Sequence, residues 1–239
     1  MHYLIDLDGT IYCGRNPLPH AADFIGFLNQ RQIPYRFLTN APENYPEDIE
    51  RRLVEMGVPA RPGAVVTAAM LAVDCLREMA AREPVRRVRV LGDDYLKGLV
   101  ARDGFILDGE RPDCVLVSFA PSITAGEIQE AACQIREGAC FIATNPDDQI
   151  PSERGLVPHT GFIVSAIAAC SGVKPVMAGK PSDALRERYL ALFGCRPEQI
   201  CVVGDRLDTD MAFARACGFR AYLMLTGAVS RQEAMGRPE

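Results

Sequence analysis

Short apolar runs and amphipathic stretches alternate along residues 1–57. The runs 3–5 and 35–38 are brief and end in polar residues, which is typical of buried strands. Pro46 and Gly57 are common helix boundary residues, and they flank the second amphipathic stretch. This part of the chain therefore predicts strand, helix, strand and helix. The predicted helix faces carry apolar residues at helical spacing, namely Phe24, Phe27, Leu28 and then Ile49, Leu53, Met56.

The C-terminal part of the chain repeats this alternation. A helix predicted over about 182–193 has Leu185, Tyr189 and Leu192 on one side, and a strand predicted over 199–203 ends at Gly204-Asp205. A further helix through 211–214 closes at Gly218, and a final strand covers 221–225. Because strands alternate with helices, both ends of the chain predict a parallel sheet with helices on its two faces.

The middle of the chain predicts a second set of elements. Strands are predicted over 89–91, 114–117 and 140–143, and a helix over 162–170. Thr124 and Glu127 have the spacing of a capping box and predict the start of another helix. A segment of this length can bury a core of its own. The predicted fold class is α/β: a Rossmann-like parallel-sheet core formed by 1-70 and 176-239, with an inserted α/β domain at 71-175.

Composition excludes several classes of protein. Of the 239 residues, 48% are hydrophobic and 24% charged, which excludes a disordered chain. No run approaches the roughly 18 apolar residues of a membrane span, so no membrane partner is expected. The net charge of −5 provides no basic field for nucleic acid. The N-terminus shows no secretory signal pattern, which predicts a cytoplasmic protein.

The cysteines and lysines are both unusual in number. Nine cysteines with no C-x-x-C pair fit neither a disulfide framework nor a zinc site. Most lie in apolar runs and are predicted to pack in the core: Cys114, Cys133, Cys140, Cys170 and Cys201. Only three of the 26 basic residues are lysines, namely Lys97, Lys174 and Lys180. A general preference for arginine codons explains this scarcity. The alternative is that a lysine is retained where the site needs its shape and arginine does not fit.

Polar residues follow the predicted strands of the core. Asp6 and Asp8 follow the first strand, Thr39 the second and Asp205 the strand near the C-terminus, while Lys180 begins the return to the core. Ligands of parallel α/β sheets bind beyond the carboxyl ends of the strands, so we expect these groups to converge. Carboxylates without histidine or thiolate favour Mg²⁺ over zinc. An aspartate can attack a phosphoryl group, and a carboxylate two residues further on can serve as acid and base.

Four segments resemble the motifs of the haloacid dehalogenase superfamily, and more closely those of its NagD-like phosphatases with a large α/β cap. They are, in order, Asp6-Leu7-Asp8-Gly9-Thr10, Thr39-Asn40, Gly179-Lys180-Pro181 and Gly204-Asp205-Arg206-Leu207-Asp208-Thr209-Asp210. The resemblance covers essentially the whole chain. It extends to Ala143-Thr144-Asn145-Pro146-Asp147, which is similar to the cap motif of that subgroup, and to its closing Thr226-Gly227.

The resemblance implies roles for the residues of the core. Asp6 is the expected nucleophile and a Mg²⁺ ligand, and Asp8 is the expected general acid/base, with its backbone carbonyl on the metal. Thr39 is expected to hydrogen-bond the phosphoryl group, and Lys180 to neutralise both that group and the nucleophile. The remaining implied roles are Asp205 as a direct metal ligand, Asp210 in the outer shell of the metal, and Asn40 as support beside the phosphate.

The length between the motifs locates the inserted domain. Only one helix and one strand fit between Asp6 and Thr39, whereas a whole domain fits between Thr39 and Lys180. This argues against the phosphomutase and dehalogenase relatives, whose main caps follow the first motif.

Two segments depart from the pattern of the subgroup. After Thr39-Asn40 the chain continues Ala41-Pro42-Glu43-Asn44-Tyr45-Pro46, where the subgroup usually has more Asn and Ser and an arginine. Asn44 or Tyr45 is therefore predicted to shape the substrate pocket. His159-Thr160-Gly161 stands where the family often has small residues. The predicted substrate-binding residues are Asn40, Asn44, Asn145, Asp147 and His159.

Structural interpretations of these residues remain open. His159 is also explained as a structural or solvated histidine, and Asn145 and Asp147 as an Asx turn around Pro146.

The leading hypothesis is a Mg²⁺-dependent phosphomonoesterase that hydrolyses a small organic phosphate, such as a sugar phosphate or a nucleotide, through an aspartyl-phosphate. A phosphotransferase using the same site and a catalytically silent binding or regulatory protein are the alternatives. A nucleotide-dependent oxidoreductase is disfavoured, because neither G-x-G-x-x-G nor a Walker A sequence is present. The expected partner is a small-molecule phosphate ester. A homodimer stays open, since cap-mediated dimers occur among members of the resembled subgroup.

Overall fold

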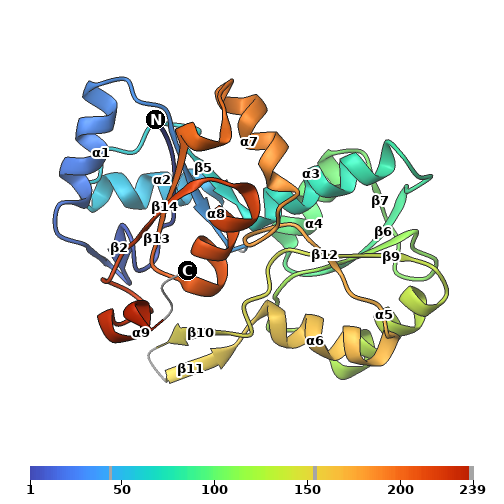
Figure 1. Ribbon diagram of the computed structural model, residues 1–239. Coiled ribbons are helices and arrows are strands. Elements are labelled where there is room, and N and C mark those ends of the chain that lie inside the picture. Colours follow the sequence, from blue (N-terminus) through green and yellow to red (C-terminus); the bar gives the residue numbers. More distant parts are fainter. Residues whose placement is uncertain (43–44, 153–154, 237–239) are drawn as a thin grey trace. The chain divides into compact units, whose positions relative to one another are not determined.

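The computed structural model describes residues 1–42, 45–152 and 155–236 (Figure 1). The chain forms two compact units. Unit 1 comprises Met1–Thr39, Tyr45–Val66 and Lys180–Glu239, and unit 2 comprises Asn40–Asn44 and Thr67–Gly179. The domain boundaries expected from the sequence, at 70/71 and 175/176, stay a prediction.

The sheet of unit 1 has the strand order β14-β13-β1-β4-β5. Its strands are β1 (His2–Ile5), β4 (Tyr35–Thr39), β5 (Val65–Thr67), β13 (Ile200–Gly204) and β14 (Arg220–Leu223). β1 pairs in parallel with both β13 and β4, and β13 pairs in parallel with β14. A short antiparallel hairpin, β2 (Tyr12–Cys13) with β3 (Asn16–Pro17), follows the first strand. The predicted parallel α/β architecture is therefore confirmed for this unit.

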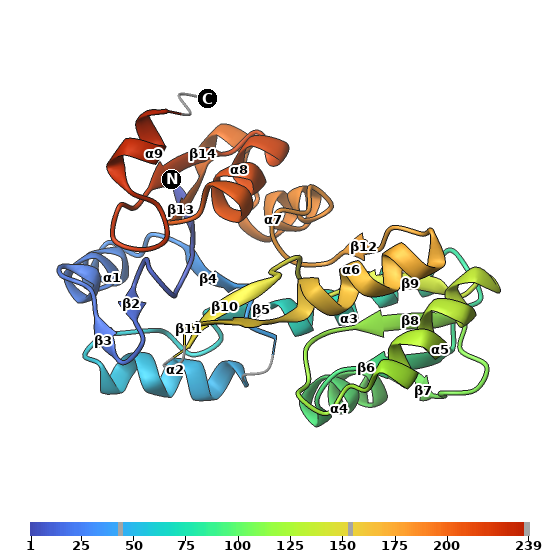
Figure 2. The ribbon, with the colours of Figure 1, turned by 90° about the horizontal axis from the view of Figure 1, so that it is seen from below.

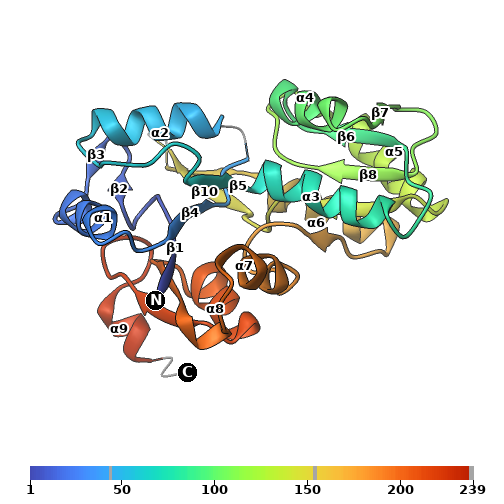
Figure 3. The same cartoon turned by 90° about the horizontal axis from the view of Figure 1, so that it is seen from above.

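Helices lie on both sides of this sheet (Figures 1 and 3). α1 (Ala21–Gln30) and α2 (Pro46–Glu55) pack against one face, where their buried residues join Ile5 and Phe37 in one apolar cluster. α7 (Leu185–Phe193) and α8 (Ala212–Cys217) contact each other through the rings of Tyr189 and Phe213. The remaining helical segments are η1 (Pro197–Gln199), the π-helical turn η2 (Leu207–Met211) and α9 (Arg231–Met235).

Two predicted helix faces need correction. Phe27 and Leu192 are each 48% exposed, although the spacing predicts them on buried faces. α1 instead buries Ala21, Ile25 and Leu28, and α7 buries Leu185 and Tyr189. A short helix buries only a narrow stripe of its surface. When the buried stripe lies one position away from the predicted one, an apolar residue at helical spacing becomes exposed.

The strand register aligns the carboxyl ends of the central strands. Ile5 lies beside Val203 of β13 and beside Phe37 of β4. The residues that follow these pairs therefore reach the same edge of the sheet. From β1 the chain proceeds to β4 on one side, and from β13 to β14 on the other, so the strand order reverses between β1 and β13. Such a switch point is where ligands of doubly wound sheets bind.

Unit 2 has a second sheet, with strand order β12-β9-β8-β6-β7 (Figure 2). Its strands are β6 (Arg87–Leu91), β7 (Ile106–Leu107), β8 (Cys114–Val117), β9 (Cys140–Ala143) and β12 (Val176–Met177), all paired in parallel. The helices are α3 (Ala68–Ala80), α4 (Asp94–Arg102), α5 (Ala125–Arg136) and α6 (Thr160–Ser171). An antiparallel hairpin joins β10 (Gln149–Ser152) and β11 (Gly155–Pro158).

The core of unit 2 confirms some predicted features and adds others. α5 and α6 share an apolar cluster with the strand residues Val115, Val117 and Phe141. Thr124 and Glu127 form both hydrogen bonds of the predicted capping box at the start of α5. α3 and the hairpin β10–β11 lie outside the predicted elements.

The nine cysteines are free thiols. Cys114 and Cys201 are buried as predicted, whereas Cys170 is exposed on α6, so its assignment to the core is wrong. Within the ranges that the structure describes, no helix combines the length and hydrophobicity of a membrane span.

Candidate active site

A buried lysine lies between two carboxylates at the carboxyl edge of the unit 1 sheet. Lys180 Nζ donates to Asp6 Oδ1 at 2.6 Å and to Asp210 Oδ1 at 2.5 Å. Lys180 is 2% exposed and Asp210 is fully buried. Asp6 and Lys180 are 174 positions apart in the sequence, so only the fold brings them together.

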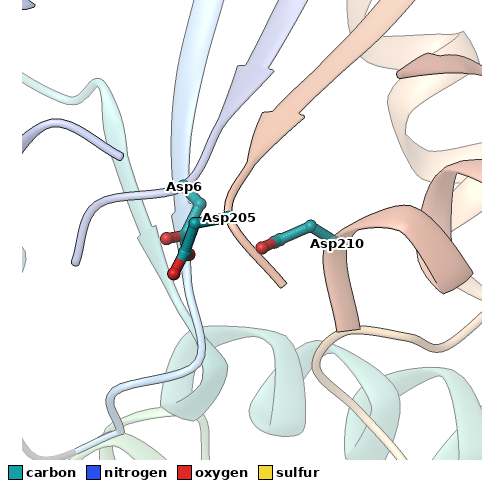
Figure 4. Close-up of side chains that lie close together, drawn as sticks. All are labelled: Asp6, Asp205 and Asp210. Atoms are coloured by element: carbon teal, nitrogen blue, oxygen red, sulfur yellow. The ribbon is translucent and has the colours of Figure 1, made fainter. Parts of the chain in front are cut away.

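Asp6, Asp205 and Asp210 reach this site from three segments of unit 1 (Figure 4). Asp6 follows β1 and Asp205 follows β13, whose ends are aligned by the parallel register. Asp210 lies in the π-helical turn η2, and its Oδ2 accepts a hydrogen bond from Arg206 N at 3.1 Å. A Cβ on Gly204 would overlap the Asp210 carboxylate, so glycine at this position lets the turn fold back onto the strand end.

The Asp205 carboxylate has one oxygen bound and one left without a protein partner. Its Oδ2 accepts a hydrogen bond from Ala228 N at 2.7 Å. Its Oδ1 is buried, and no group in the described part of the chain hydrogen-bonds it. Burial of a carboxylate oxygen without a hydrogen bond costs folding free energy unless a bound ion or water interacts with it.

The three carboxylates fit a hard divalent cation. One oxygen of each of Asp6, Asp205 and Asp210 lies within 4.8 Å of the others. Three carboxylates face a single ammonium group, so the ionised site carries excess negative charge. The donor set consists of oxygen alone, which matches Mg²⁺, and Asp205 Oδ1, which no described group hydrogen-bonds, can serve as a ligand.

Burial and the crowding of charges shift the pKa values of the site. Burial raises the pKa of Asp6 to about 7; Lys180 opposes this shift and Asp210 adds to it. Burial alone would lower the pKa of Lys180, but the carboxylates of Asp210 and Asp6 outweigh it and hold the pKa above its usual range. Burial also raises the pKa of Asp205, against the hydrogen bond from Ala228. A bound cation would favour the ionised forms of both aspartates.

The loop after Asp6 is held by a tyrosine that the sequence patterns did not identify. Gly9 N donates to Tyr12 O at 2.7 Å, and Arg52 Nη2 of α2 donates to the Tyr12 hydroxyl at 2.6 Å. The Arg52 guanidinium also lies over the Tyr12 ring, 4.8 Å from its centroid. Burial, with Asp8 and Asp6 nearby, raises the pKa of Tyr12 to about 12, so the hydroxyl stays protonated. Arg52 and Tyr12 thus connect the Asp8 loop to α2.

Asp8 and Thr39 occupy the edge of the sheet where the sequence predicts them. Asp8 is exposed two residues beyond Asp6, and Thr39 is 7% exposed at the last position of β4.

Glycines allow the closing segment of unit 1 to approach the site. A Cβ on Gly9, whose φ is +83°, or on Gly227 would overlap the Asp205 carboxylate. Thr226 Oγ1 donates to Gly9 O at 2.7 Å and joins the two segments. Thr226-Gly227 is a motif of the sequence, but its packing against Asp205 depends on contacts between residues far apart in the chain.

The predicted substrate-binding residues that the structure describes lie in unit 2. Asn40 Nδ2 donates to Asp147 Oδ2 at 3.2 Å, and Asn145 Nδ2 donates to Asn40 O at 2.9 Å. His159 is 3% exposed, and its ring stacks on Phe119 with centroids 4.7 Å apart. Burial lowers the pKa of His159. Asn44 lies outside the described residues.

The substrate-binding roles of Asn40, Asn145, Asp147 and His159 stay predictions. Tyr45, the other residue predicted to shape the pocket, directly precedes α2 in unit 1 and is 47% exposed.

Comparison with known proteins agrees with this arrangement. Residues 3–106 match a family model described as haloacid dehalogenase-like hydrolase, and residues 177–239 match a second HAD-hydrolase-like model. The acid sugar phosphatase of Staphylococcus aureus strain USA300 is 34% identical over 236 residues, which cover 98% of this chain and 90% of that protein.

Two solved structures share the fold over nearly the whole chain. NagD from Escherichia coli K-12 superimposes with a TM-score of 0.90 at 30% identity, covering 100% of this chain and 92% of NagD. A glycerol phosphate phosphatase from Mycobacterium tuberculosis, in complex with magnesium, gives a TM-score of 0.84 at 36% identity, covering 97% of this chain and 69% of that one.

The doubly wound sheet, taken with these matches, defines a haloacid dehalogenase-like hydrolase fold. The chain belongs to the haloacid dehalogenase superfamily, within its NagD-like phosphatases, and is a phosphoric monoester hydrolase.

Proposed function

We propose that the protein is a Mg²⁺-dependent phosphomonoesterase that hydrolyses small organic phosphates through an aspartyl-phosphate on Asp6. The observation that carries this proposal is the hydrogen-bonded group of Asp6, Lys180 and Asp210 beside Asp205 Oδ1, an oxygen that no described group hydrogen-bonds. The named activities of the relatives, acid sugar phosphatase and glycerol phosphate phosphatase, support a small phosphate ester as substrate.

Asp6, Asp205 and the backbone carbonyl of Asp8 are the proposed Mg²⁺ ligands, with Asp210 in the outer shell. Bound there, Mg²⁺ would neutralise the clustered carboxylates and the charge on the phosphoryl oxygens. Asp210 fits an outer position because its two oxygens already accept hydrogen bonds from Lys180 Nζ and Arg206 N.

In the first step, an Asp6 carboxylate oxygen attacks the phosphorus atom, and the bond from phosphorus to the ester oxygen breaks. Asp8 donates its proton to the departing oxygen, so the alcohol leaves neutral. Lys180 keeps Asp6 oriented through the 2.6 Å hydrogen bond and balances the negative charge of the phosphoryl group. The hydroxyl group of Thr39, at the end of β4, donates a hydrogen bond to a phosphoryl oxygen.

In the second step, water replaces Asp6 on the phosphorus atom. Asp8, now ionised, accepts a proton from the water as its oxygen attacks, and the bond between Asp6 and phosphorus breaks. The products are inorganic phosphate and the ionised Asp6.

A screen of phosphate esters with Mg²⁺ tests this proposal, with Asp6→Asn as the matched variant. We expect phosphate release that needs Mg²⁺ and is abolished by Asp6→Asn, and brief acid quenching should trap phosphate on wild-type protein only. Magnesium-dependent turnover that survives in Asp6→Asn would overturn the mechanism. Transfer of the phosphoryl group to an added alcohol in preference to water would instead identify a phosphotransferase.

A further inference from the structure

Two neighbouring residues of unit 2 bind two of the segments at which the chain passes between the units. These are the first crossing, where Asn40 of unit 2 follows Thr39, and the last crossing, where Gly179 of unit 2 precedes Lys180. Asn145 Nδ2 donates to Asn40 O at 2.9 Å. Gly179 N donates to Thr144 O at 2.8 Å. The loop after β9 therefore holds the backbone next to two of the proposed phosphoryl-binding residues.

The side chain of Asn145 is buried and hydrogen-bonded within unit 2. It is 0% exposed, and besides Asn40 O its Nδ2 lies 3.3 Å from both Thr144 Oγ1 and Thr160 Oγ1. Its Oδ1 accepts a hydrogen bond from Asp147 N at 3.1 Å. An amide has two N–H donors and a carbonyl oxygen with two lone pairs, and here both donors and one lone pair are engaged. Donation of a hydrogen bond from Asn145 to a substrate would require breaking these contacts.

Asn40 and Gly179 pack against each other. A Cβ on Gly179 would lie 2.7 Å from Asn40 Oδ1 and 2.6 Å from Thr144 O. The other polar atom of the Asn40 side chain, Nδ2, donates to Asp147 Oδ2 at 3.2 Å. A side chain at position 179 would therefore displace both Asn40 and the Thr144 backbone. We call Asn40, Asn145, Asp147 and Gly179, together with Thr144, the crossover cluster.

The loop that carries Asn145 is itself fixed to the start of α6. Gly161 N donates to Asp147 O at 2.8 Å, and His159 N donates to Asp148 O at 2.9 Å. A Cβ on Gly161 would lie 2.7 Å from Asp148 N, so the loop and the helix are in close contact. The loop of the crossover cluster is consequently held in place by its hydrogen bonds to the start of α6.

We propose that the crossover cluster positions Thr39 and Lys180 for phosphoryl binding, with Asn145 as a positioning residue and not a substrate contact. The proposal rests on the proposed function, because it gives Thr39 and Lys180 their role there. A displacement of about 1 Å in a group that orients a substrate costs about 100-fold in rate. Loss of the Asn145 hydrogen bond to Asn40 O is expected to reduce activity through such a displacement.

The test compares Asn145→Asp with Gln134→Glu. Both changes replace a buried side-chain amide by a carboxyl group and so remove a hydrogen bond to a backbone carbonyl. Gln134 matches Asn145 in this respect, because it is 4% exposed and its Nε2 donates to Gly109 O at 2.8 Å. Gln134 lies on α5, outside the crossover cluster. The readouts are kcat and KM for the two best esters with chemically different leaving groups, the inhibition constant of inorganic phosphate, and the melting temperature.

A positioning role predicts one pattern. Asn145→Asp should lower kcat by about 10- to 100-fold for both esters and weaken inhibition by inorganic phosphate, which has no leaving group. Gln134→Glu should leave these constants within about twofold. Gly179→Ala approaches the cluster from its other side and should repeat the Asn145→Asp pattern, which keeps the test available if Asn145→Asp does not fold.

Three results would overturn the proposal. One is a KM change for a single ester with kcat and phosphate inhibition unchanged, which identifies Asn145 as a substrate contact. Another is an equal loss of activity in Gln134→Glu at an equal loss of melting temperature. The third is unchanged protection from hydrogen exchange over residues 176–182 in Asn145→Asp, which rejects the cluster as a positioning device. This measurement does not depend on activity. If the wild-type protein hydrolyses no ester, the proposed function fails by itself and hydrogen exchange still tests the cluster.

Discussion

Replacing Lys180 by arginine keeps the positive charge and changes only the shape of the group that carries it. A single nitrogen, Lys180 Nζ, donates to Asp6 at 2.6 Å and to Asp210 at 2.5 Å, and the side chain is 2% exposed. Both distances are shorter than the usual range of about 2.7–2.9 Å for charge-assisted N–H···O hydrogen bonds, so a wider group does not fit between the two carboxylates. The planar guanidinium would push Asp6 or Asp210 from its place.

The magnitude follows from what is displaced. Overpacking of a buried site costs about 1–3 kcal/mol of folding free energy, which a domain of this size tolerates. Removal of one electrostatic partner of the transferring group costs about 10²–10³ in rate. We therefore expect Lys180→Arg to fold and to lose at least about 100-fold in kcat/KM, equivalent to about 2.7 kcal/mol at about 1.36 kcal/mol per factor of ten.

The assay is kcat/KM with saturating Mg²⁺ together with urea unfolding in EDTA. Lys97→Arg is the matched control, because Lys97 pairs with Asp94 at 3.3 Å on the surface of α4 and should change the free energy of unfolding by less than about 0.5 kcal/mol. Lys180→Met should unfold more easily than Lys180→Arg, since two buried carboxylates lose their cation. Near-normal turnover of Lys180→Arg would refute the shape argument and leave codon preference as the reason for the scarcity of lysine.

Three further predictions concern the proposed metal site. Because the pKa of metal-free Asp6 is raised to about 7, Mg²⁺ should compete with a proton, and its dissociation constant measured by calorimetry should rise about tenfold per pH unit below 7. The same raised pKa makes Asp6 destabilise the metal-free fold as the pH rises from about 4 through 7, so the wild-type protein should lose more stability over that range than Asp6→Asn; an equal loss in both proteins contradicts this assignment. Gly227→Ala should weaken Mg²⁺ binding at least about tenfold, because the added Cβ overlaps the Asp205 carboxylate, and unchanged affinity would show that Asp205 is not a ligand.

Local patterns predicted many of the elements of both units. The capping box of α5, the proline at the start of α2 and the glycine after α8 act within one turn of chain, so the sequence alone identifies them. α3 was not predicted, although it buries six residues, because its alanine-rich face offers little contrast between apolar and polar positions. The exposure of Phe27 and Leu192 depends on which stripe of each helix meets the sheet, and spacing does not determine this.

The sequence predicts that the groups of the site converge, since Asp6, Thr39 and Asp205 each follow a predicted strand and parallel strands end at the same edge. How these groups are paired depends on the tertiary structure. Lys180 reaches Asp6 across 174 positions, and the close approach of Gly227 to Asp205 depends on backbone packing between distant segments. That Asn145 holds Asn40 within unit 2 also depends on the tertiary structure. Periodicity reports the burial of a position, whereas hydrogen-bond partners are chosen by the folded geometry.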